Sequence, residues 1–266
     1  YVQKTEELFK NGKAEMILSL KNISLNFGGI KAVDQVSLDV KKGEIFALIG
    51  PNGAGKSTMF NIISRYYTQS NGSIIYRNES IDKLQPHQLS KIGVARTFQN
   101  IELFPNSTVL QNLLVGQNSS KSSNFLQEML FFPSVRKAEI DRRIIVEEVI
   151  DFLNLQPFRD KQISALSYGT RKIVELGRAL SMQPNLLLLD EPASGLSAEE
   201  TTDLAFWIED IKKIMGITVL MVEHDLNLVG KVADRVGALV EGNLVAVGSL
   251  KEIQANRKVV EAYIGT

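Results

Sequence analysis

Residues 45–63, "IFALIGPNGAGKSTMFNII", carry the strongest indication of the fold class. The first six residues are apolar or glycine, so both faces of an extended segment would be buried, as in a strand of a parallel sheet. This strand runs directly into a loop of small residues and then into a segment with helical character. The order strand, loop, helix predicts an α/β protein that binds its ligand at the loop.

The loop itself, "GPNGAGKST", satisfies the pattern G-x-x-x-x-G-K-[ST] in full. In that pattern backbone N–H groups surround phosphate oxygens, the lysine reaches the β- and γ-phosphates, and the following hydroxyl, here Ser57, ligates Mg²⁺. A glycine turn with an unrelated lysine is the alternative, which the flanking strand and helix disfavour. The predicted nucleotide-binding residues are Gly50, Pro51, Asn52, Gly53, Ala54, Gly55, Lys56, Ser57 and Thr58.

A second segment, "LLLLDEP", supplies acidic groups. An apolar strand that ends at Asp190 places this carboxylate at the ligand edge of the sheet, where it can hold Mg²⁺ through water. Glu191, one residue further, can orient and deprotonate an attacking water molecule. An acidic pair alone would more often cap the next helix, but the phosphate loop upstream favours a catalytic role.

The composition limits the classes of partner. Lys plus Arg and Asp plus Glu both number 30, so the net charge is zero and a polyanionic partner such as nucleic acid is disfavoured. The absence of cysteine excludes disulfide bonds, thiolate metal ligands and a cysteine nucleophile. The longest apolar runs, such as residues 186–189, are far shorter than the roughly 20 residues that a membrane-spanning helix needs. Residues 1–15 have mixed charge, and we expect a loosely ordered leader or an expression remnant.

The first half of the chain combines strands with a helical segment. A strand is expected from near Met16, two more flank the turn at Lys42-Gly43, and "GSIIYRNESI" is predicted to form a hairpin. From about Thr97 the character changes, and apolar residues recur at helical spacing, which predicts an inserted helical segment. The residues of this series are Ile140, Ile144, Ile145, Val149 and Phe152.

The second half returns to alternating strands and helices. The segments "NLLLLD" and "ITVLMVEHD" are predicted strands, separated by a helix over residues 198–215. Such a unit gives parallel strands with a right-handed crossover. A hairpin turned at Gly242-Asn243 and a final amphipathic helix are expected to follow.

Several motifs occur together in a fixed order and resemble those of the ATP-binding subunits of ABC transporters, over nearly the whole chain from about Met16. They are "GPNGAGKST", "TFQN" at 97–100, "LSYGT" at 166–170, "LLLLDEP", "SGLS" at 194–197 and "VEHD" at 222–225. The resemblance implies a P-loop NTPase (RecA-like) core with an antiparallel β subdomain and an inserted helical subdomain. It further implies a single ABC ATPase domain over residues 16–266, with the core at 16–96 and 177–266 and the helical subdomain at about 97–176.

The same resemblance implies roles for three further residues. Gln99 is similar to the Q-loop residue that senses the γ-phosphate, Mg²⁺ and the membrane partner, so it is a candidate both for catalysis and as a metal ligand. His224 is similar to the switch histidine that contacts the γ-phosphate. Phe27 lies where the family places an aromatic ring that stacks on adenine. Taken singly, the glutamine and histidine would more often be solvated, and the phenylalanine could be an ordinary strand residue.

The signature segment "LSYGT" explains why the chain carries a second phosphate-binding pattern. In the family that this sequence resembles, two subunits pack head to tail, and the signature of one covers the ATP held by the other. Ser167 and Gly169 are therefore expected to bind the γ-phosphate of the ATP held by the partner subunit. Tyr168 and Thr170 depart from the commonest signature, Leu-Ser-Gly-Gly-Gln. Ser197 stands where the segment "SGLS" usually ends in an acidic residue.

The resemblance extends to a subfamily of importers. The segments "NFGGIKAVDQVSL", "ARTFQNIELFPNSTVLQNLLVGQ", "FFPSVRKAE" and "VVEAYIGT" resemble the ATPase subunits of importers for branched-chain amino acids and of relatives that handle urea or other small polar solutes. The implied cofactors are ATP and Mg²⁺. The implied partners are integral membrane permease subunits, a second ATPase subunit of the same or a related chain and, indirectly, an extracytoplasmic solute-binding protein, but no nucleic acid. The implied location is the cytoplasmic face of a bacterial or archaeal cell membrane.

Three alternatives stay open from the residues alone. "FLQEMLFF", residues 125–132, could contact the membrane subunit or pack on its own helical insertion. A soluble ABC-type ATPase acting on nucleic acid or ribosomes would be favoured by a second cassette, a coiled-coil insertion or a basic face, none of which the sequence contains. A nucleotide-gated module without turnover would lack Glu191 or His224, and both are present.

Overall fold

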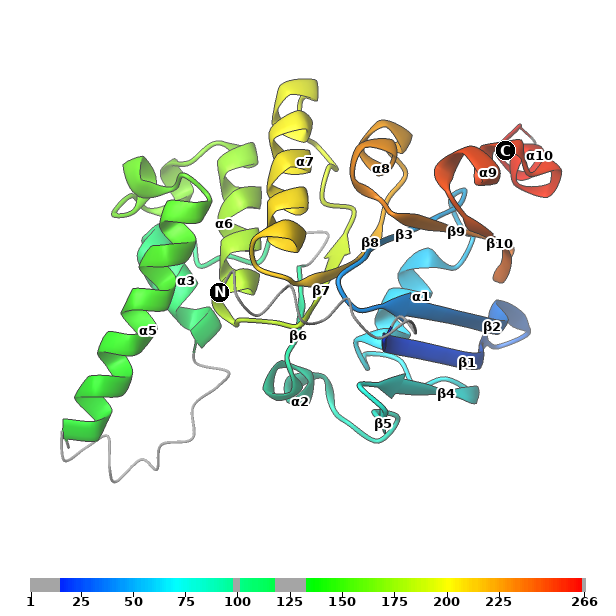
Figure 1. Cartoon of the computed structure of the whole chain (residues 1–266), viewed down its shortest axis with the longest axis horizontal. Helices are drawn as coiled ribbons and strands as arrows, with labels where there is room; N and C mark the ends of the chain where they lie inside the picture. The colour runs from blue at the N-terminus through cyan, green and yellow to red at the C-terminus, as the bar shows by residue number, and fades with distance from the viewer. Residues whose placement is uncertain (1–14, 98–100, 118–132, 265–266) are drawn as a thin grey trace.

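The computed structural model describes residues 15–97, 101–117 and 133–264, which form two sheets with helices around them (Figure 1). The smaller sheet is antiparallel, in the order β2-β1-β4-β5. Its strands are β1 Met16–Phe27, β2 Ile30–Lys41, β4 Asn71–Tyr76 and β5 Glu79–Ser80. The expected strand from Met16 and the expected hairpin of β4 and β5 are therefore confirmed.

The larger sheet has the order β10-β9-β3-β8-β7-β6, and all neighbours are parallel except β9 and β10. Every residue of β3, β7 and β8 is buried, which is why these strands are continuous apolar runs in the sequence. The strands are β3 Ile45–Ile49, β6 Val94–Arg96, β7 Leu186–Asp190, β8 Thr218–Val222, β9 Arg235–Val240 and β10 Asn243–Gly248. The expected parallel arrangement of β7 and β8 is confirmed.

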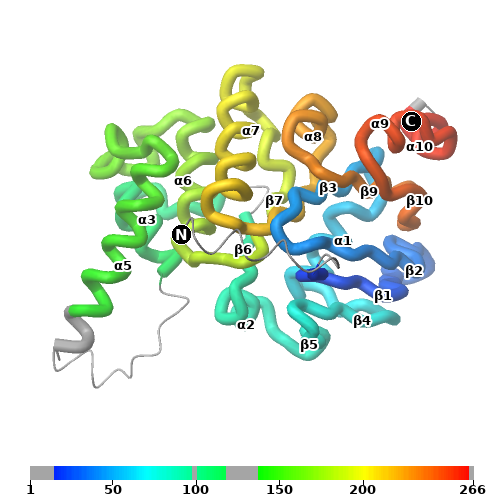
Figure 2. The backbone as a smooth tube through the Cα atoms, in the orientation of Figure 1, coloured from blue at the N-terminus to red at the C-terminus, as the bar shows by residue number. Residues whose placement is uncertain are grey.

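Helices fill the space on both faces of this sheet (Figure 2). Along β3, Phe46 and Leu48 pack into the core shared with α1 and the small sheet, whereas Ile45, Ala47 and Ile49 face the core beneath the other helices. Helix α1, Lys56–Ile63, thus lies between the two sheets. The opposite face is covered by α6 Tyr168–Ser181, α7 Ala198–Lys213, α8 Leu226–Val232 and α9 Leu250–Ala255.

The helical segment after β6 contains α3, Val109–Gln117, and α5, Pro133–Phe152, which pack against each other and against α6. Only part of the predicted apolar series on α5 is buried: Val149 is enclosed, but Ile140 and Ile144 are about half exposed. The reason is that α5 contacts its neighbours near its C-terminal end, while its other end projects away from the molecule (Figure 1). The position 176/177, predicted as a subdomain boundary, falls within the continuous helix α6.

Two details of the C-terminal region differ from the sequence-based expectation. The β9–β10 turn is formed by Glu241 and Gly242, both with positive φ, because Asn243 already pairs with Val240. The final helix is divided into α9 and α10, Arg257–Ile264, at Asn256. The side chain of Asn256 accepts the N–H of Lys258, which starts a new helix and ends the previous one.

The remaining short elements connect these layers. They are α2 Pro86–Leu89 and the 3₁₀ turns Ser90–Ile92, Gln156–Phe158 and Ile163–Ala165. Across residues 15–97, 101–117 and 133–264, no helix is both long enough and apolar enough to cross a membrane.

Candidate nucleotide-binding site

The phosphate loop joins the C-terminal end of β3 to α1. Gly53 and Gly55 have φ values of 79° and 98°, which side chains rarely adopt. A Cβ atom at Gly55 would lie 2.5 Å from the carbonyl oxygen of Ala32, whereas one at Gly53 would meet no atom within 4 Å. The loop therefore packs against Ala32 at Gly55, whereas the space beside Gly53 is open. A loop that binds a phosphate group needs such an open side.

Lys56 is buried in this loop and is 6% exposed. Its Nζ atom donates to the carbonyl oxygens of Gly50 at 2.7 Å and Pro51 at 2.9 Å. Burial lowers the pKa of Lys56, and the nearby negative charge of Glu191 opposes that shift. The lysine thus lies within electrostatic reach of the predicted catalytic carboxylate.

Asp190 ends β7 and is 5% exposed. Its Oδ2 atom accepts a hydrogen bond from Nη2 of Arg96 at 2.7 Å. Arg96 also donates to Asn61 of α1 at 2.9 Å, so the arginine connects β6, β7 and α1. The sequence analysis did not identify Arg96, because its partner Asp190 is 94 positions away. The position of Arg96 at a strand end, three residues before Gln99, was the one feature of the sequence that could have indicated a role.

Glu191 and His224 meet where β7 and β8 end. The backbone of Glu191 is left-handed, with φ 47°, and its N–H donates to the carbonyl of Val222 at 3.0 Å. The Oε2 atom of Glu191 lies 3.9 Å from Nδ1 of His224. The imidazole is more than half exposed, and the carboxylate is largely enclosed. A strained backbone at a carboxylate of this kind is typical of functional sites.

The structure thus brings together Lys56, Asp190, Glu191 and His224 at the C-terminal edge of the sheet, where open α/β sheets bind ligands. Gln99 lies outside the described residues. No group of three or more His, Cys, Asp or Glu residues suited to a metal occurs within the described ranges. Of the three predicted Mg²⁺ ligands, Ser57 and Asp190 lie in the described part of the chain, and a hydroxyl and a carboxylate together with phosphate oxygens are donors that suit this cation.

The signature residues lie at the start of α6, against α7. The side chain of Ser167 caps α6 by accepting the N–H of Thr170 at 3.2 Å. A Cβ atom at Gly169 would come within 1.9 Å of Oε1 of Glu200, in the first turn of α7. A larger residue at position 169 would therefore require the Glu200 side chain to move.

Tyr168 and Ser197, two of the residues that depart from the usual family patterns, both make local contacts. The hydroxyl of Tyr168 donates to the carbonyl of Ser194 at 3.3 Å, and its ring covers Gly195. Ser197 caps α7 by accepting the N–H of Glu200 at 3.2 Å, and the Glu200 side chain accepts the N–H of Ser197 in return. The signature and the "SGLS" segment are thus joined within one chain.

Phe27 ends β1, and its ring is 48% exposed. The ring makes an edge-to-face contact with Tyr67, with 5.3 Å between the centroids. The free face of such a ring can stack on a planar base. His87, to which the sequence assigns no role, lines a groove between α2 and α6.

The model of the ABC transporter family matches residues 33–194, from within β2 through the signature segment to the loop after Asp190 and Glu191. The chain belongs to the ABC transporter family. The resemblance inferred from the motifs is thereby confirmed, and the chain is an ATPase of this family.

Individual relatives can be aligned with this chain over almost its entire length. The chain is 36% identical to the high-affinity branched-chain amino acid transport ATP-binding protein BraF of Pseudomonas aeruginosa, over 94% of this chain and 98% of the relative. It is similar to the crystal structure of a nucleotide-free ATP-binding cassette from an ABC transporter, with a TM-score of 0.82, 33% identity and coverage of 94% and 100%. A dimeric bacterial ABC transporter cassette matches with a TM-score of 0.73 and 26% identity, over 88% of this chain and 98% of the other. The predicted fold class is confirmed by these structures.

Proposed function

We propose that this chain is the ATP-binding and ATP-hydrolysing subunit of an importer for branched-chain amino acids or a related small polar solute. The observation that carries the proposal is the position of Glu191, which lies 3.9 Å from His224 and acts electrostatically on Lys56 of the phosphate loop. The solute class rests on the similarity to BraF. The alternative, a soluble ATPase acting on nucleic acid, is disfavoured by the zero net charge.

ATP binding would redirect Lys56. In the structure, the ammonium group donates to the carbonyl oxygens of Gly50 and Pro51. Phosphate oxygens carry more charge than carbonyl oxygens, so charge-assisted hydrogen bonds to the β- and γ-phosphates replace these contacts. The open side of the loop at Gly53 supplies backbone N–H donors, and Phe27 offers a ring face for adenine.

Hydrolysis is assigned to Glu191, with His224 and Gln99 as residues that contact the γ-phosphate. Bound Mg²⁺ would neutralise phosphate charge, and Ser57 and Asp190 are the residues that would hold it. Glu191 accepts a proton from the attacking water, and its fixed backbone limits the positions that its carboxylate can reach. His224 is exposed enough to reach a nucleotide bound beside it.

Two such subunits would close head to tail over ATP. Ser167 and Gly169 at the start of α6 would then lie at the γ-phosphate of the partner's ATP, with the N-terminal dipole of α6 directed at it. The dimeric cassette that matches this chain supports the pairing of two such subunits. Binding of ATP would favour the closed dimer, and hydrolysis would remove the contacts that hold it.

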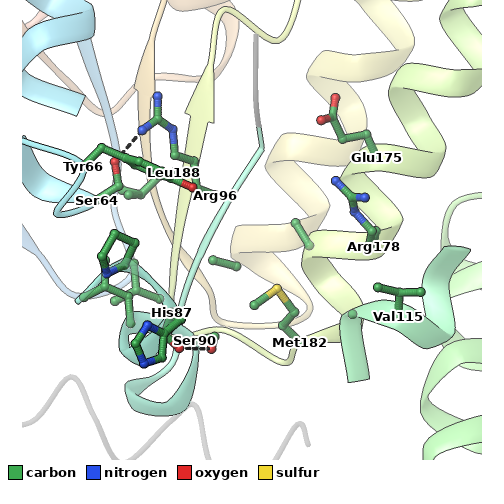
Figure 3. Close-up of a pocket in the computed structure, with 16 residues that line it drawn as sticks. Ser64, Tyr66, His87, Ser90, Arg96, Val115, Glu175, Arg178, Met182 and Leu188 are labelled. Atoms are coloured by element: carbon green, nitrogen blue, oxygen red, sulfur yellow. Dashed lines mark hydrogen bonds between the residues drawn. The ribbon is translucent and has the colours of Figure 1, made fainter. Parts of the chain in front are cut away.

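The permease would bind in a groove of about 600 Å³ between β6 and α2 on one side and α3 and α6 on the other (Figure 3). Its lining is largely apolar and includes Tyr66 and Val115, both exposed, and Met182. A cytoplasmic helix of a membrane subunit is the proposed occupant, because the groove lies where the helical segment meets the sheet. The proposed core, residues 16–96 and 177–266, and the proposed helical subdomain, about 97–176, would both contribute to this groove.

This arrangement would place the chain at the cytoplasmic face of a bacterial or archaeal membrane. A solute-binding protein on the other side would act on it only indirectly, through the permease. The segment "FLQEMLFF", considered as a further contact with the permease, lies outside the described residues.

The proposal can be tested by affinity capture of the tagged chain from detergent-solubilised membranes of its source, with identification of the proteins that accompany it by mass spectrometry. We expect multi-span permease subunits, with or without a second cassette. A control capture through a known transporter subunit verifies that complexes survive the detergent. Recovery of ribosomes or soluble partners alone would contradict the proposal.

A further inference from the structure

Glu223, between β8 and His224, is a carboxylate with no exposed surface. Its Oε1 atom accepts the N–H of Ala193 at 2.8 Å, and its Oε2 atom accepts the N–H groups of His224 at 2.9 Å and Asp225 at 3.2 Å. Burial raises the pKa of Glu223, and the three amide donors oppose that shift. This carboxylate has no role in the ATP site described above.

The three donors belong to two loops that are distant in the sequence. Ala193 lies two residues after Glu191, in the loop that follows β7, while His224 and Asp225 belong to the loop that follows β8. The N–H of Glu223 donates to the carbonyl of Leu48 at 3.2 Å, which ties the same residue to the end of β3. Glu223 therefore joins the ends of the three strands that surround the nucleotide site.

The contacts require a carboxylate rather than another polar group. Both oxygen atoms face N–H donors, and only a carboxylate offers acceptors on both sides. A glutamine would direct its NH₂ group toward at least one N–H, which would leave a buried donor without an acceptor. The chemistry of the site thus distinguishes Glu223 from a residue that only fills space.

We infer that Glu223 is a positioning residue that fixes the switch histidine relative to the catalytic carboxylate. Nδ1 of His224 lies 3.9 Å from Oε2 of Glu191 and 4.0 Å from Oε2 of Glu223, so the imidazole borders both the predicted catalytic carboxylate and the buried one. It also holds the loop in which Glu191 has its left-handed backbone, a conformation that persists only where its surroundings enforce it. The inference rests on the proposed roles of Glu191 and His224 and adds the residue that sets their separation.

The test compares Glu223→Gln with the control Glu44→Gln. Glu44 is also buried and accepts from Arg235 at 3.0 Å and from the Lys41 N–H at 2.6 Å, but it lies at the opposite end of β3. For Glu223→Gln we expect kcat for ATP to fall by at least about tenfold while KM changes less than about twofold, since the phosphate loop is untouched. Glu44→Gln should keep kcat within about twofold of the unsubstituted chain.

Hydrogen exchange gives a readout that does not depend on activity. In Glu223→Gln the amides of Ala193 and of His224 and Asp225 should exchange faster together, although they lie in two different loops, and Glu44→Gln should leave them unchanged. Unaltered exchange at Ala193, or an unaltered kcat in the folded variant, would overturn the inference. If Glu223→Gln does not fold, Glu223→Asp replaces it in the test. Aspartate keeps both acceptor oxygens, but its side chain is too short to reach both loops. A kcat of Glu223→Asp equal to that of the unsubstituted chain would overturn the inference. An unsubstituted chain without ATPase activity would instead refute the proposed function.

Discussion

Nη2 of Arg96 lies 2.7 Å from Oδ2 of Asp190, and the exposed fractions of the two side chains are only 12% and 6%. The guanidinium also lies over the rings of Phe60 and Tyr66, at 5.8 and 5.5 Å from their centroids. Arg96 and Tyr66 line the groove assigned to the permease (Figure 3). Asp190 is one of the predicted Mg²⁺ ligands. A single buried ion pair therefore connects the groove with the nucleotide site.

Removal of this arginine should destabilise the fold. Arg96→Ala leaves the Asp190 carboxylate buried without its cation, which costs about 3–5 kcal/mol in the free energy of unfolding. Urea denaturation measures the change. The control is Arg257→Ala, whose side chain is 90% exposed and pairs with Glu261, and it should change stability by less than about 1 kcal/mol. Equal effects of the two substitutions would contradict the structural importance of the Arg96–Asp190 pair.

A charge in the groove should prevent binding of the permease without affecting ATP. Val115 on α3 is 39% exposed and lines the groove, so Val115→Asp would place an unpaired carboxylate in the predicted interface. Capture of membrane subunits should be lost, and affinity for a fluorescent ATP analogue should be unchanged. Phe206→Asp on α7 is the matched control, because Phe206 is exposed and is not part of the groove. If Val115→Asp still captures the permease, the groove is not its binding site.

Substitution of the catalytic carboxylate should separate binding from hydrolysis. Glu191→Gln removes the base but keeps the size of the side chain, so kcat should fall by about 10²-fold or more. Because ATP then persists, gel filtration with ATP should reveal a dimer that is absent with ADP. Unimpaired turnover of the variant would remove Glu191 from the role of general base.

A pH dependence of stability is expected from the pair of Glu147 on α5 and Arg159. The hydrogen bonds from Arg159 lower the pKa of Glu147 from its ordinary value of 4.5, against a smaller effect of burial. A carboxyl group whose pKa is lowered in the folded state stabilises the protein above the unfolded pKa, and this contribution is lost as the pH falls through the folded value. The stability difference between the unsubstituted chain and Glu147→Gln should therefore be present at pH 7 and shrink below about pH 4.5, to an extent limited by the 40% exposure of Glu147. Thermal unfolding across pH 3–7 measures it, and a difference that does not change with pH would contradict the assignment.

Much of the fold and the ATP site could be predicted because the signals are local. Strand β3 and the loop after it are continuous in the sequence, and β7 and β8 are apolar runs that end directly at Asp190 and before His224. The unpredicted features depend on distant partners. The division of the final helix depends on the side chain of Asn256, and the half-exposed Ile140 reflects the absence of packing partners among the described residues near that end of α5, which helical periodicity does not encode.

Besides the Arg96–Asp190 pair, the contacts of Glu223 and Tyr168 were missed for the same reason. Glu223 directly precedes His224 and could be recognised as a charged residue at the end of a buried strand, but its contact with Ala193 spans 30 positions. Tyr168 was recognised only as a departure from the signature, and its contact with Ser194 became visible once α6 and the "SGLS" segment were placed together.

The most direct test of the central proposal is uptake of radiolabelled leucine by proteoliposomes that contain the captured complex and its solute-binding protein, with ATP enclosed on the side of this chain. Uptake should require ATP and should be abolished when the complex carries Glu191→Gln, with valine and isoleucine as competitors and urea as the comparison solute. ATP hydrolysis by an intact complex without ATP-dependent uptake of any of these solutes would contradict the proposed function.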